Sequence, residues 1–292
     1  MSSTAAKRIV VCGGNGFLGS RICKAAVARG WDVTSISRSG TPTWSAVTAS
    51  PSPPSWSHSV TWERANILQP STYIPLLSSA DYVVHSMGIL LEADYKGVLS
   101  GQEPPISGLQ RAFSASKRGS QNPLERKSGE DLDPQEHDGQ LTYELMNRDS
   151  AIALAKEAKE AGAKAMVYVS AAGGAPVLPR RYIETKRAAE ETIEREFGGV
   201  MRNVFIRPGF LYDASRRFTI PLAAMTGLGA AFNGITGGVF SGLMGAAGTK
   251  PLKADLVAEA VVEALSDETV KGPVEVKGIE ELAEKGWRKG ML

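Results

Sequence analysis

The chain of 292 residues contains few of the residues that hold metals or form disulfides. Its two cysteines, Cys12 and Cys23, show no CxxC or metal-ligand spacing, so we expect both to be small buried side chains. The redox state of the compartment is then either reducing or of no consequence for the fold. The three histidines are scattered, without acidic residues at ligand spacing, so we expect no metal site. No Gly-x-Ser-x-Gly turn occurs, which argues against the hydrolases that carry their nucleophile there.

Neither sign of charge dominates the chain. The formal net charge of +2 gives no reason to expect nucleic acid or an acidic membrane surface as a partner. Contents of 42% hydrophobic and 22% charged residues are ordinary for a globular protein of one or two domains. Residues 1–8 are too short and polar for a signal peptide, and they leave no room for an ordinary mitochondrial presequence before the first strand.

Strand and helix patterns alternate along the first two-thirds of the chain. We predict strands at residues 8–12, 31–36, 60–64, 82–85, 165–170 and 203–207, with helices at 17–29, 142–161 and 182–197. A helix at 256–266 and a short strand at 274–277 close the chain. This alternation predicts an α/β fold with a Rossmann-type, doubly wound parallel sheet. We assign residues 1–212 to a dinucleotide-binding domain and 213–292 to a small C-terminal substrate-binding region.

Three segments interrupt the alternation. Residues 41–59 are rich in Pro and Ser and predict a loop. Residues 93–140 are polar and without periodicity, which predicts a long surface insertion that is partly disordered. Residues 218–249 contain no charged residue and are dense in Gly and Ala.

A glycine-rich turn joins the first predicted strand to the first helix. Gly13, Gly16 and Gly19 have the spacing in which the first permits a tight turn, the second lets a pyrophosphate approach the backbone, and the third lets helix and strand pack closely. Free N–H groups and the helix dipole then bind phosphate. The turn predicts a nicotinamide dinucleotide site formed by Gly13, Gly14, Asn15, Gly16, Phe17, Leu18 and Gly19.

The end of the second strand indicates which dinucleotide binds. NAD enzymes usually carry Asp or Glu there for the adenosine ribose, whereas this chain has Ser37, Arg38, Ser39 and Gly40. The guanidinium of Arg38 is suited to a 2′-phosphate, although a solvated loop arginine is the alternative. The sequence therefore favours NADP(H) over NAD(H).

Tyr182 and Lys186 lie four residues apart at the start of a predicted helix, so their side chains share one face. A phenol is a poor acid at neutral pH, and a nearby ammonium lowers its pKa. The pair is therefore suited to exchange a proton with a carbonyl as a hydride is transferred. Ser170, at the end of the preceding strand, is placed to hydrogen-bond the same carbonyl oxygen.

Together with Arg207, Pro208 and Gly209, these motifs make the chain resemble the extended or atypical short-chain dehydrogenases/reductases from residue 8 to about 213. In these enzymes the tyrosine is the acid or base, the lysine binds the nicotinamide ribose and polarises the tyrosine, and the serine orients the substrate. The resemblance implies further cofactor contacts at Asn66 and Ile67 beside the adenine, at Ser86, Met87 and Gly88 beside the middle of the cofactor, and at Pro208 and Gly209 in the nicotinamide pocket. It also implies that Asn147 supports the lysine. Asn66 and Asn147 have the alternative of being surface polar residues.

More narrowly, the chain resembles fungal mitochondrial atypical reductases associated with coenzyme Q biosynthesis, relatives of the NADPH-binding accessory subunit of respiratory complex I. The glycine turn, the Ser37–Gly40 segment, the polar insertion and the turn that begins at Ser170 carry this resemblance. It implies mitochondrial ubiquinone metabolism. Without a clear presequence, a cytoplasmic location is the alternative.

The uncharged segment at residues 218–249 has three interpretations. Its Gly, Ser, Thr and Asn content and the return of the later elements to the domain argue against a membrane-spanning helix. If it does not span a membrane, the segment is interpreted as a flexible apolar lid over a quinone-like substrate, as a patch that docks on a membrane surface, or as ordinary core of the substrate domain.

Three functions remain. The leading prediction is an NADPH-dependent reductase of a carbonyl or quinone-pathway intermediate. The alternative is a non-catalytic NADPH-binding subunit of a membrane-associated complex, which ligand binding would stabilise. An isomerase or epimerase of nucleotide-sugars is disfavoured, because the uncharged segment offers no partner for substrate phosphates.

Overall fold

The computed structural model describes residues 6–48, 50–88, 122–132, 141–173, 180–213 and 249–291. Within them, seven strands form one sheet in the order β3-β2-β1-β4-β5-β6-β9, with every neighbouring pair parallel. The strands are β1 (Arg8–Cys12), β2 (Asp32–Ser37), β3 (Val60–Arg64), β4 (Tyr82–His85), β5 (Ala165–Val169), β6 (Arg202–Ile206) and β9 (Gly272–Val274). The strand order reverses between β1 and β4, which is where sheets of this type bind dinucleotides.

The central strands are apolar runs buried on both faces. All four residues of β4 and all five of β5 are buried, as expected for parallel strands covered by helices on each side. The register places Cys12 of β1 opposite Ile36 of β2 and His85 of β4. The carboxyl ends of these three strands therefore finish together, and the turns that follow them meet at one edge.

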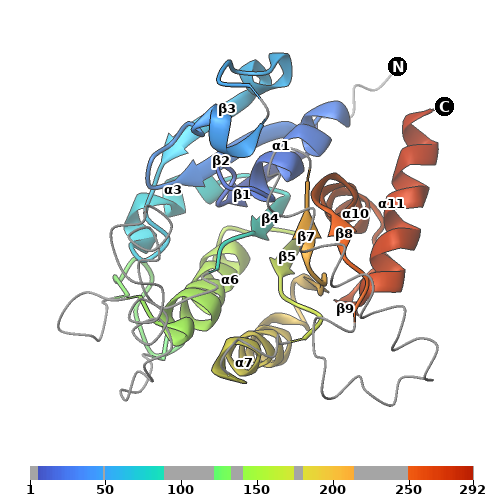
Figure 1. Cartoon of the computed structure of the whole chain (residues 1–292). Coiled ribbons are helices and arrows are strands. Elements are labelled where there is room, and N and C mark those ends of the chain that lie inside the picture. The colour runs from blue at the N-terminus through green and yellow to red at the C-terminus, as the bar shows by residue number, and fades with distance from the viewer. Residues whose placement is uncertain are drawn as a thin grey trace, which may run out of the picture.

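Helices cover both faces of the sheet (Figure 1). Helices α1 (Gly19–Ala28), α10 (Ala254–Ser266) and α11 (Val276–Gly290) pack on one face around a core that includes Ile22, Val261 and Ile279. The other face is covered by α3 (Ile74–Leu77), α6 (Ser150–Glu160) and α7 (Arg180–Phe197), with Leu154 in its core. The predicted doubly wound sheet is confirmed, and both cysteines are buried as expected.

The chain beyond Asp213 returns to the same sheet. Strand β9 pairs with β6, and α10 packs against α1, as expected for the closing elements. The short strands β7 (Leu211–Tyr212) and β8 (Leu252–Lys253) pair with each other. Residues 214–248 connect them and lie outside the described residues, so the interpretations of the uncharged segment stay predictions. In the described part of the chain, no helix is long and apolar enough to cross a membrane. The domain division at residue 212 stays a prediction.

Two predicted elements differ from the structure. The closing strand is present, but its predicted bounds of 274–277 are wrong, because β9 ends at Val274 and Val276 begins helix α11. The helical spacing of Ile279, Leu282, Ala283 and Gly286 buries one face of α11 and overrides the short apolar run. The loop expected at 41–59 contains α2 (Trp44–Val47) and the 3-10 helix η1 (Ser55–Ser59), where Trp44 packs edge-on against Trp56 and Trp62.

Part of the predicted insertion is a docked surface turn. Leu132 is buried, and its N–H donates to the Leu68 carbonyl at 2.7 Å. Glu157 of α6 accepts hydrogen bonds from the Ser128 hydroxyl at 2.7 Å and from the Gly129 N–H at 3.3 Å. Residues 122–132 are therefore ordered against α6, while 93–121 and 133–140 lie outside the described residues.

Candidate cofactor and active site

The glycine turn after β1 has the backbone geometry that a dinucleotide site requires. Gly13 has φ +85°, a left-handed conformation that most side chains disfavour. A Cβ on Gly19 would lie 2.1 Å from the Gly13 carbonyl oxygen, so the start of α1 packs directly on the turn. A Cβ on Gly16 would meet only that oxygen, at 3.1 Å, among the described residues. Apart from this oxygen and the neighbouring residues in the chain, no described atom lies within 4 Å of that position, which is the side from which a phosphate is expected to approach the backbone.

The turn after β2 lies against the glycine turn. Asn15 donates from Nδ2 to Ser39 Oγ at 2.6 Å, which joins the two turns across the carboxyl edge of the sheet. The Ser37 hydroxyl closes its own turn by donating to the Gly40 carbonyl at 2.9 Å. Arg38 is exposed between them. The structure thus brings Arg38 to the edge where the adenosine ribose of a dinucleotide binds.

The turn after β4 also packs against the glycine turn. Ser86 donates from Oγ to the Cys12 carbonyl at 2.8 Å, and a Cβ on Gly13 would lie 2.7 Å from Met87 Cγ. Gly88 follows, and its Cβ position lies 3.0 Å from Asn147 Oδ1 and 3.6 Å from Lys186 Nζ. This turn therefore connects the glycine turn to Lys186.

Asn66 and Ile67 have structural roles in the loop after β3. Asn66 Oδ1 accepts from the Leu68 N–H at 3.2 Å, and its Nδ2 donates to Gln69 Oε1 at 3.3 Å. Ile67 is buried in the core. The side chain of Asn66 is thus half-buried and already bonded within its own loop, and an adenine contact at these two residues stays a prediction.

Lys186 is a buried cation beside two aromatic rings. Its Nζ donates to the Val169 carbonyl at 3.1 Å and lies 5.1 Å from the ring centre of Tyr168 and 5.8 Å from that of Tyr182. Burial lowers the pKa of Lys186 to about 8. The helical spacing predicted for Tyr182 and Lys186 is therefore present on α7, with the ammonium over the phenol ring.

The electrostatics of Tyr182 differ from the expectation. Burial raises its pKa to about 12, and Arg187 is the residue whose charge lowers it. The expected fall in the phenol pKa is not found, because desolvation of the phenolate outweighs the attraction of Arg187. Tyr182 also packs edge-on against Tyr143, with ring centres 5.8 Å apart. At neutral pH this phenol holds its proton.

Ser170 is held by an arginine that we did not predict. Arg187 donates from Nη1 to Ser170 Oγ at 3.1 Å and from Nη2 to the Ala171 carbonyl at 2.7 Å. The same guanidinium pairs with Glu190 at 2.8 Å. The only signal in the sequence is the position of Arg187 directly after the lysine, which does not by itself indicate a contact with Ser170.

Asn147 is fully buried, so the alternative that it is a surface residue is wrong. It lies in a π-helix, η3 (Glu144–Asp149), and the Tyr168 hydroxyl donates to its carbonyl. Single π-turns often occur at functional sites because they redirect side chains. Next to this group, His85 is also buried, and burial lowers its pKa to about 3, so it is neutral.

Pro208 and Gly209 follow β6 and adjoin the end of β5. The Pro208 carbonyl accepts from the Ala172 N–H at 2.8 Å, and a Cβ on Gly209 would lie 2.9 Å from the Lys250 carbonyl oxygen. Arg207 pairs with Glu190 from Nη2 and with Glu275 from Nη1 at 2.7 Å. The turn of Ser170 and the expected nicotinamide pocket are therefore adjacent.

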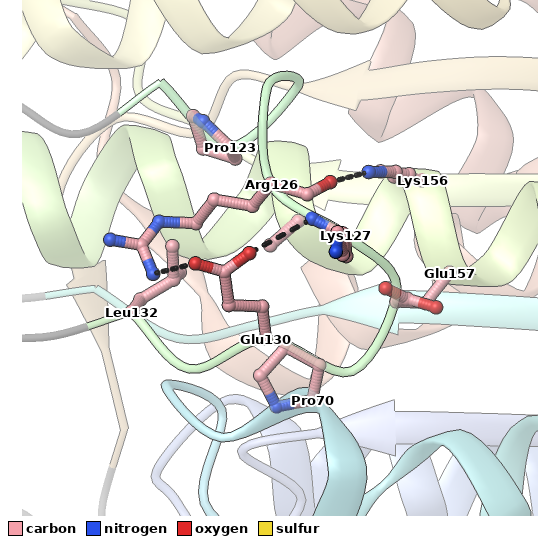
Figure 2. A pocket seen from close by; sticks show the side chains of 9 residues that line it. Pro70, Pro123, Arg126, Lys127, Glu130, Leu132, Lys156 and Glu157 are labelled. Atoms are coloured by element: carbon pink, nitrogen blue, oxygen red, sulfur yellow. Dashed lines mark hydrogen bonds and ion pairs between the residues drawn. The ribbon is translucent and has the colours of Figure 1, made fainter.

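A metal centre and a separate pocket are the other kinds of site to consider among the described residues. No group of three or more His, Cys, Asp or Glu among them has the arrangement of a metal site. A small pocket lies between α6 and the turn at 122–132 (Figure 2), where Arg126 pairs with Glu130 at 3.3 Å and Lys156 donates to the Arg126 carbonyl. None of the predicted site residues lines this pocket.

The fold and the glycine turn define a nicotinamide-dinucleotide-binding protein of the short-chain dehydrogenase/reductase class. Residues 9–94 match the NAD dependent epimerase/dehydratase family. Over 222 residues the chain is 38% identical to MIOREX complex component 2 of Saccharomyces cerevisiae, covering 72% of this chain and 74% of the yeast protein. The chain belongs to this epimerase/dehydratase family, the extended branch of the class. An uncharacterised chloroplastic protein of Arabidopsis thaliana is 38% identical over 88 residues, 30% of this chain and 27% of that protein.

Solved structures agree on the fold. WbmG of Bordetella bronchiseptica, solved with NAD, has a TM-score of 0.52 at 15% identity, covering 99% of this chain and 80% of that protein. UDP-glucuronic acid 4-epimerase of Bacillus cereus, also solved with NAD, has a TM-score of 0.54 at 14% identity over 92% and 76% of the two chains. Alfalfa vestitone reductase has a TM-score of 0.51 at 15% identity over 92% and 77%. These likenesses show the fold, and the match to the NAD dependent epimerase/dehydratase family confirms the prediction of a nicotinamide cofactor at the level of the family.

Proposed function

We propose that this protein is an NADP(H)-dependent oxidoreductase that reduces a carbonyl or a quinone-pathway intermediate. The observation that carries the proposal is the meeting of three elements at one point. The position of a Cβ on Gly88, after β4, lies 3.0 Å from buried Asn147 and 3.6 Å from Lys186 Nζ. The expected path of the cofactor thus ends at the lysine that shares a helix face with Tyr182.

The residues present fit a bound dinucleotide. The turn from Gly13 to Gly19 would hold the pyrophosphate, Ser86, Met87 and Gly88 the middle of the cofactor, and Lys186, Pro208 and Gly209 its nicotinamide end. When bound, the reduced nicotinamide supplies a hydride. Two observations support these assignments: little lies beside the Cβ position of Gly16, and the carboxyl ends of β1, β2 and β4 meet at one edge of the sheet.

Tyr182 would supply the proton. Its pKa of about 12 keeps the phenol protonated at neutral pH, which suits donation from Oη to the oxygen of a carbonyl that accepts a hydride at carbon. The carbonyl gains a hydride and a proton and becomes an alcohol, the nicotinamide is oxidised, and Tyr182 is left as a tyrosinate that regains its proton from solvent. Ser170 would donate a hydrogen bond to the same oxygen, because its own oxygen already accepts one from Arg187.

The proposal also specifies which dinucleotide binds and which kind of substrate is reduced. Arg38 at the end of β2, where NAD enzymes place a carboxylate, supports NADP(H). The uncharged segment at 218–249 and the resemblance to reductases of coenzyme Q biosynthesis support an apolar, quinone-like substrate, a mitochondrial setting and peripheral membrane association.

A second candidate function is a non-catalytic NADPH-binding subunit of an assembly. It is favoured by one observation, that the yeast relative is named as a component of a complex. In this function NADPH stabilises the fold, and the stabilisation grows with ligand excess to about 4 kcal/mol at a thousandfold excess over Kd.

Single-turnover oxidation of bound NADPH distinguishes the two functions. The purified protein, loaded with NADPH, is mixed with simple carbonyls and with polyprenyl-quinone intermediates while the absorbance of reduced nicotinamide is followed. Tyr182→Phe is compared with Tyr82→Phe, whose hydroxyl lies at the amino end of β4, away from the site. Oxidation lost only in Tyr182→Phe supports the reductase. Tight NADPH binding without oxidation by any compound would overturn it in favour of the subunit.

A further inference from the structure

Two arginines flank the turn that follows β2. In the pairing of β2 with β3, Ser37 lies opposite Arg64, so Arg38 and Arg64 stand at the ends of neighbouring parallel strands. The side chain of Arg64 packs against the turn, with its Cγ 3.1 Å from the position that a Cβ on Gly40 would occupy. Gly40 has φ +72°, so a glycine permits both this turn and the close contact.

Both guanidiniums are exposed, and neither has a carboxylate partner among the residues that the structure describes. Glu63 is the acidic residue next to Arg64, but successive side chains point to opposite faces of a strand. Many arginines elsewhere are paired with carboxylates, as Arg29 is with Glu263 and Arg207 with Glu275. The turn therefore presents two positive charges that no carboxylate in the described part of the chain compensates.

These charges lie beside the dinucleotide site. The bond from Asn15 Nδ2 to Ser39 Oγ, 2.6 Å long, fixes the arginine turn against the glycine turn. An anion bound between Arg38 and Arg64 would therefore sit at the adenosine end of a cofactor whose pyrophosphate lies on the glycine turn. A phosphate monoester matches this chemistry, because guanidiniums bind phosphate oxygens through paired, charge-assisted hydrogen bonds.

We propose that Arg38 and Arg64 together form a phosphomonoester site that selects the 2′-phosphate of NADP(H), with Arg64 as the second guanidinium. The proposal rests on the nicotinamide cofactor of the proposed function and adds the residue that discriminates between the two cofactors. The family is described by its dependence on NAD, so a site for the 2′-phosphate would be a feature of this chain that the family description does not include.

Binding measurements test the site without requiring turnover. Dissociation constants for NADPH and NADH are measured by nucleotide fluorescence for the unmodified chain, Arg64→Gln, Arg64→Lys and Arg195→Gln. Arg195 is an exposed arginine on α7 and provides the same charge change outside the turn. Competition by 2′-AMP and 5′-AMP on the unmodified chain gives a second measurement that depends on no substitution.

Arg64→Gln is expected to weaken NADPH binding by about tenfold, the loss of one charge-assisted pair, while NADH binding changes less than about twofold. Arg64→Lys recovers part of the loss, Arg195→Gln changes neither constant, and 2′-AMP competes better than 5′-AMP. Equal weakening of NADPH and NADH, no weakening, or equal competition by the two nucleotides overturns the proposal. Because all these readouts are of binding, their failure differs from absence of NADPH oxidation, which overturns only the reductase.

Discussion

Arg187 donates from Nη1 to the Oγ of Ser170 at 3.1 Å and thereby decides which way that hydroxyl can act. An oxygen that accepts from a guanidinium directs its own hydrogen to another acceptor. Nη2 of Arg187 also holds the Ala171 and Ala172 carbonyls, and Glu190 balances its charge. Arg187 is therefore a positioning residue for Ser170 and for the turn after β5.

Replacing Arg187 with Met should lower kcat of the proposed reduction by about 10–100-fold, with a smaller change in KM, because Ser170 loses its orientation. The effect should depend on Ser170. In a double-mutant cycle with Ser170→Ala, the second substitution costs little after the first. Arg187→Lys should restore part of kcat, and the pH profile of Arg187→Met should show a higher pKa for Tyr182, since Arg187 lowers it. Losses that simply multiply would contradict the positioning role.

The contact between Arg187 and Ser170 also marks the limit of inference from sequence. The glycine turn and the spacing of Tyr182 and Lys186 are local patterns, so backbone geometry determines what neighbouring residues do. The partner of Ser170 lies 17 residues away on a helix, and only the packing of α7 against β5 brings the two side chains together. Electrostatics are equally non-local, because the pKa of Tyr182 depends on its burial.

Lys186 should reduce the stability of the fold at neutral pH. The unfolded chain binds its proton up to about its ordinary pKa of 10.5, whereas burial lowers the folded value to about 8. Between these values the unfolded state binds more protons, so the contribution of Lys186 to stability is unfavourable at pH 7 and becomes less so as the pH rises. Its size at pH 7 is on the order of 3 kcal/mol.

Lys186→Met should therefore raise the free energy of unfolding at pH 7, and the gain should shrink between pH 8 and pH 10.5. Urea unfolding at several pH values measures it. Lys159→Met, at an exposed position on α6, corrects for the general effect of the substitution. A gain that is independent of pH would show that the folded protein does not shift the titration of Lys186.

Gly19 should tolerate no side chain. Its Cβ would lie 2.1 Å from the carbonyl oxygen and 2.7 Å from the carbonyl carbon of Gly13, and both are backbone atoms that move only if the turn changes shape. Gly19→Ala is expected to cost about 1–3 kcal/mol of stability and to weaken NADPH binding by at least about tenfold. Gly199→Ala is the matched control, since a Cβ there meets nothing within 4 Å. Unchanged NADPH affinity in Gly19→Ala would argue against cofactor binding on this turn.

Three helices on one face of the sheet are joined by a buried carboxylate whose partners are distant in the sequence. Glu263 of α10 occurs in an apolar helical run, and we had not given it a role. It is fully buried, and its carboxylate accepts from Arg29 Nη1 of α1 at 3.1 Å and from Lys289 Nζ of α11 at 2.5 Å. One carboxylate thus joins three helices on the same face of the sheet, including α11, which we had not predicted.

Glu263→Gln should lower the free energy of unfolding by roughly 2–4 kcal/mol, because the substitution leaves Arg29 and Lys289 without their shared, desolvated partner. The control is Glu281→Gln, whose carboxylate lies 3.8 Å from Lys277 and is 66% exposed, so its loss should cost less than about 0.5 kcal/mol. Chemical denaturation measures both variants. Equal, small losses would mean that Arg29 and Lys289 find other partners, since Glu259 also pairs with Arg29. Combining Glu263→Gln with Glu259→Gln would then expose the full cost.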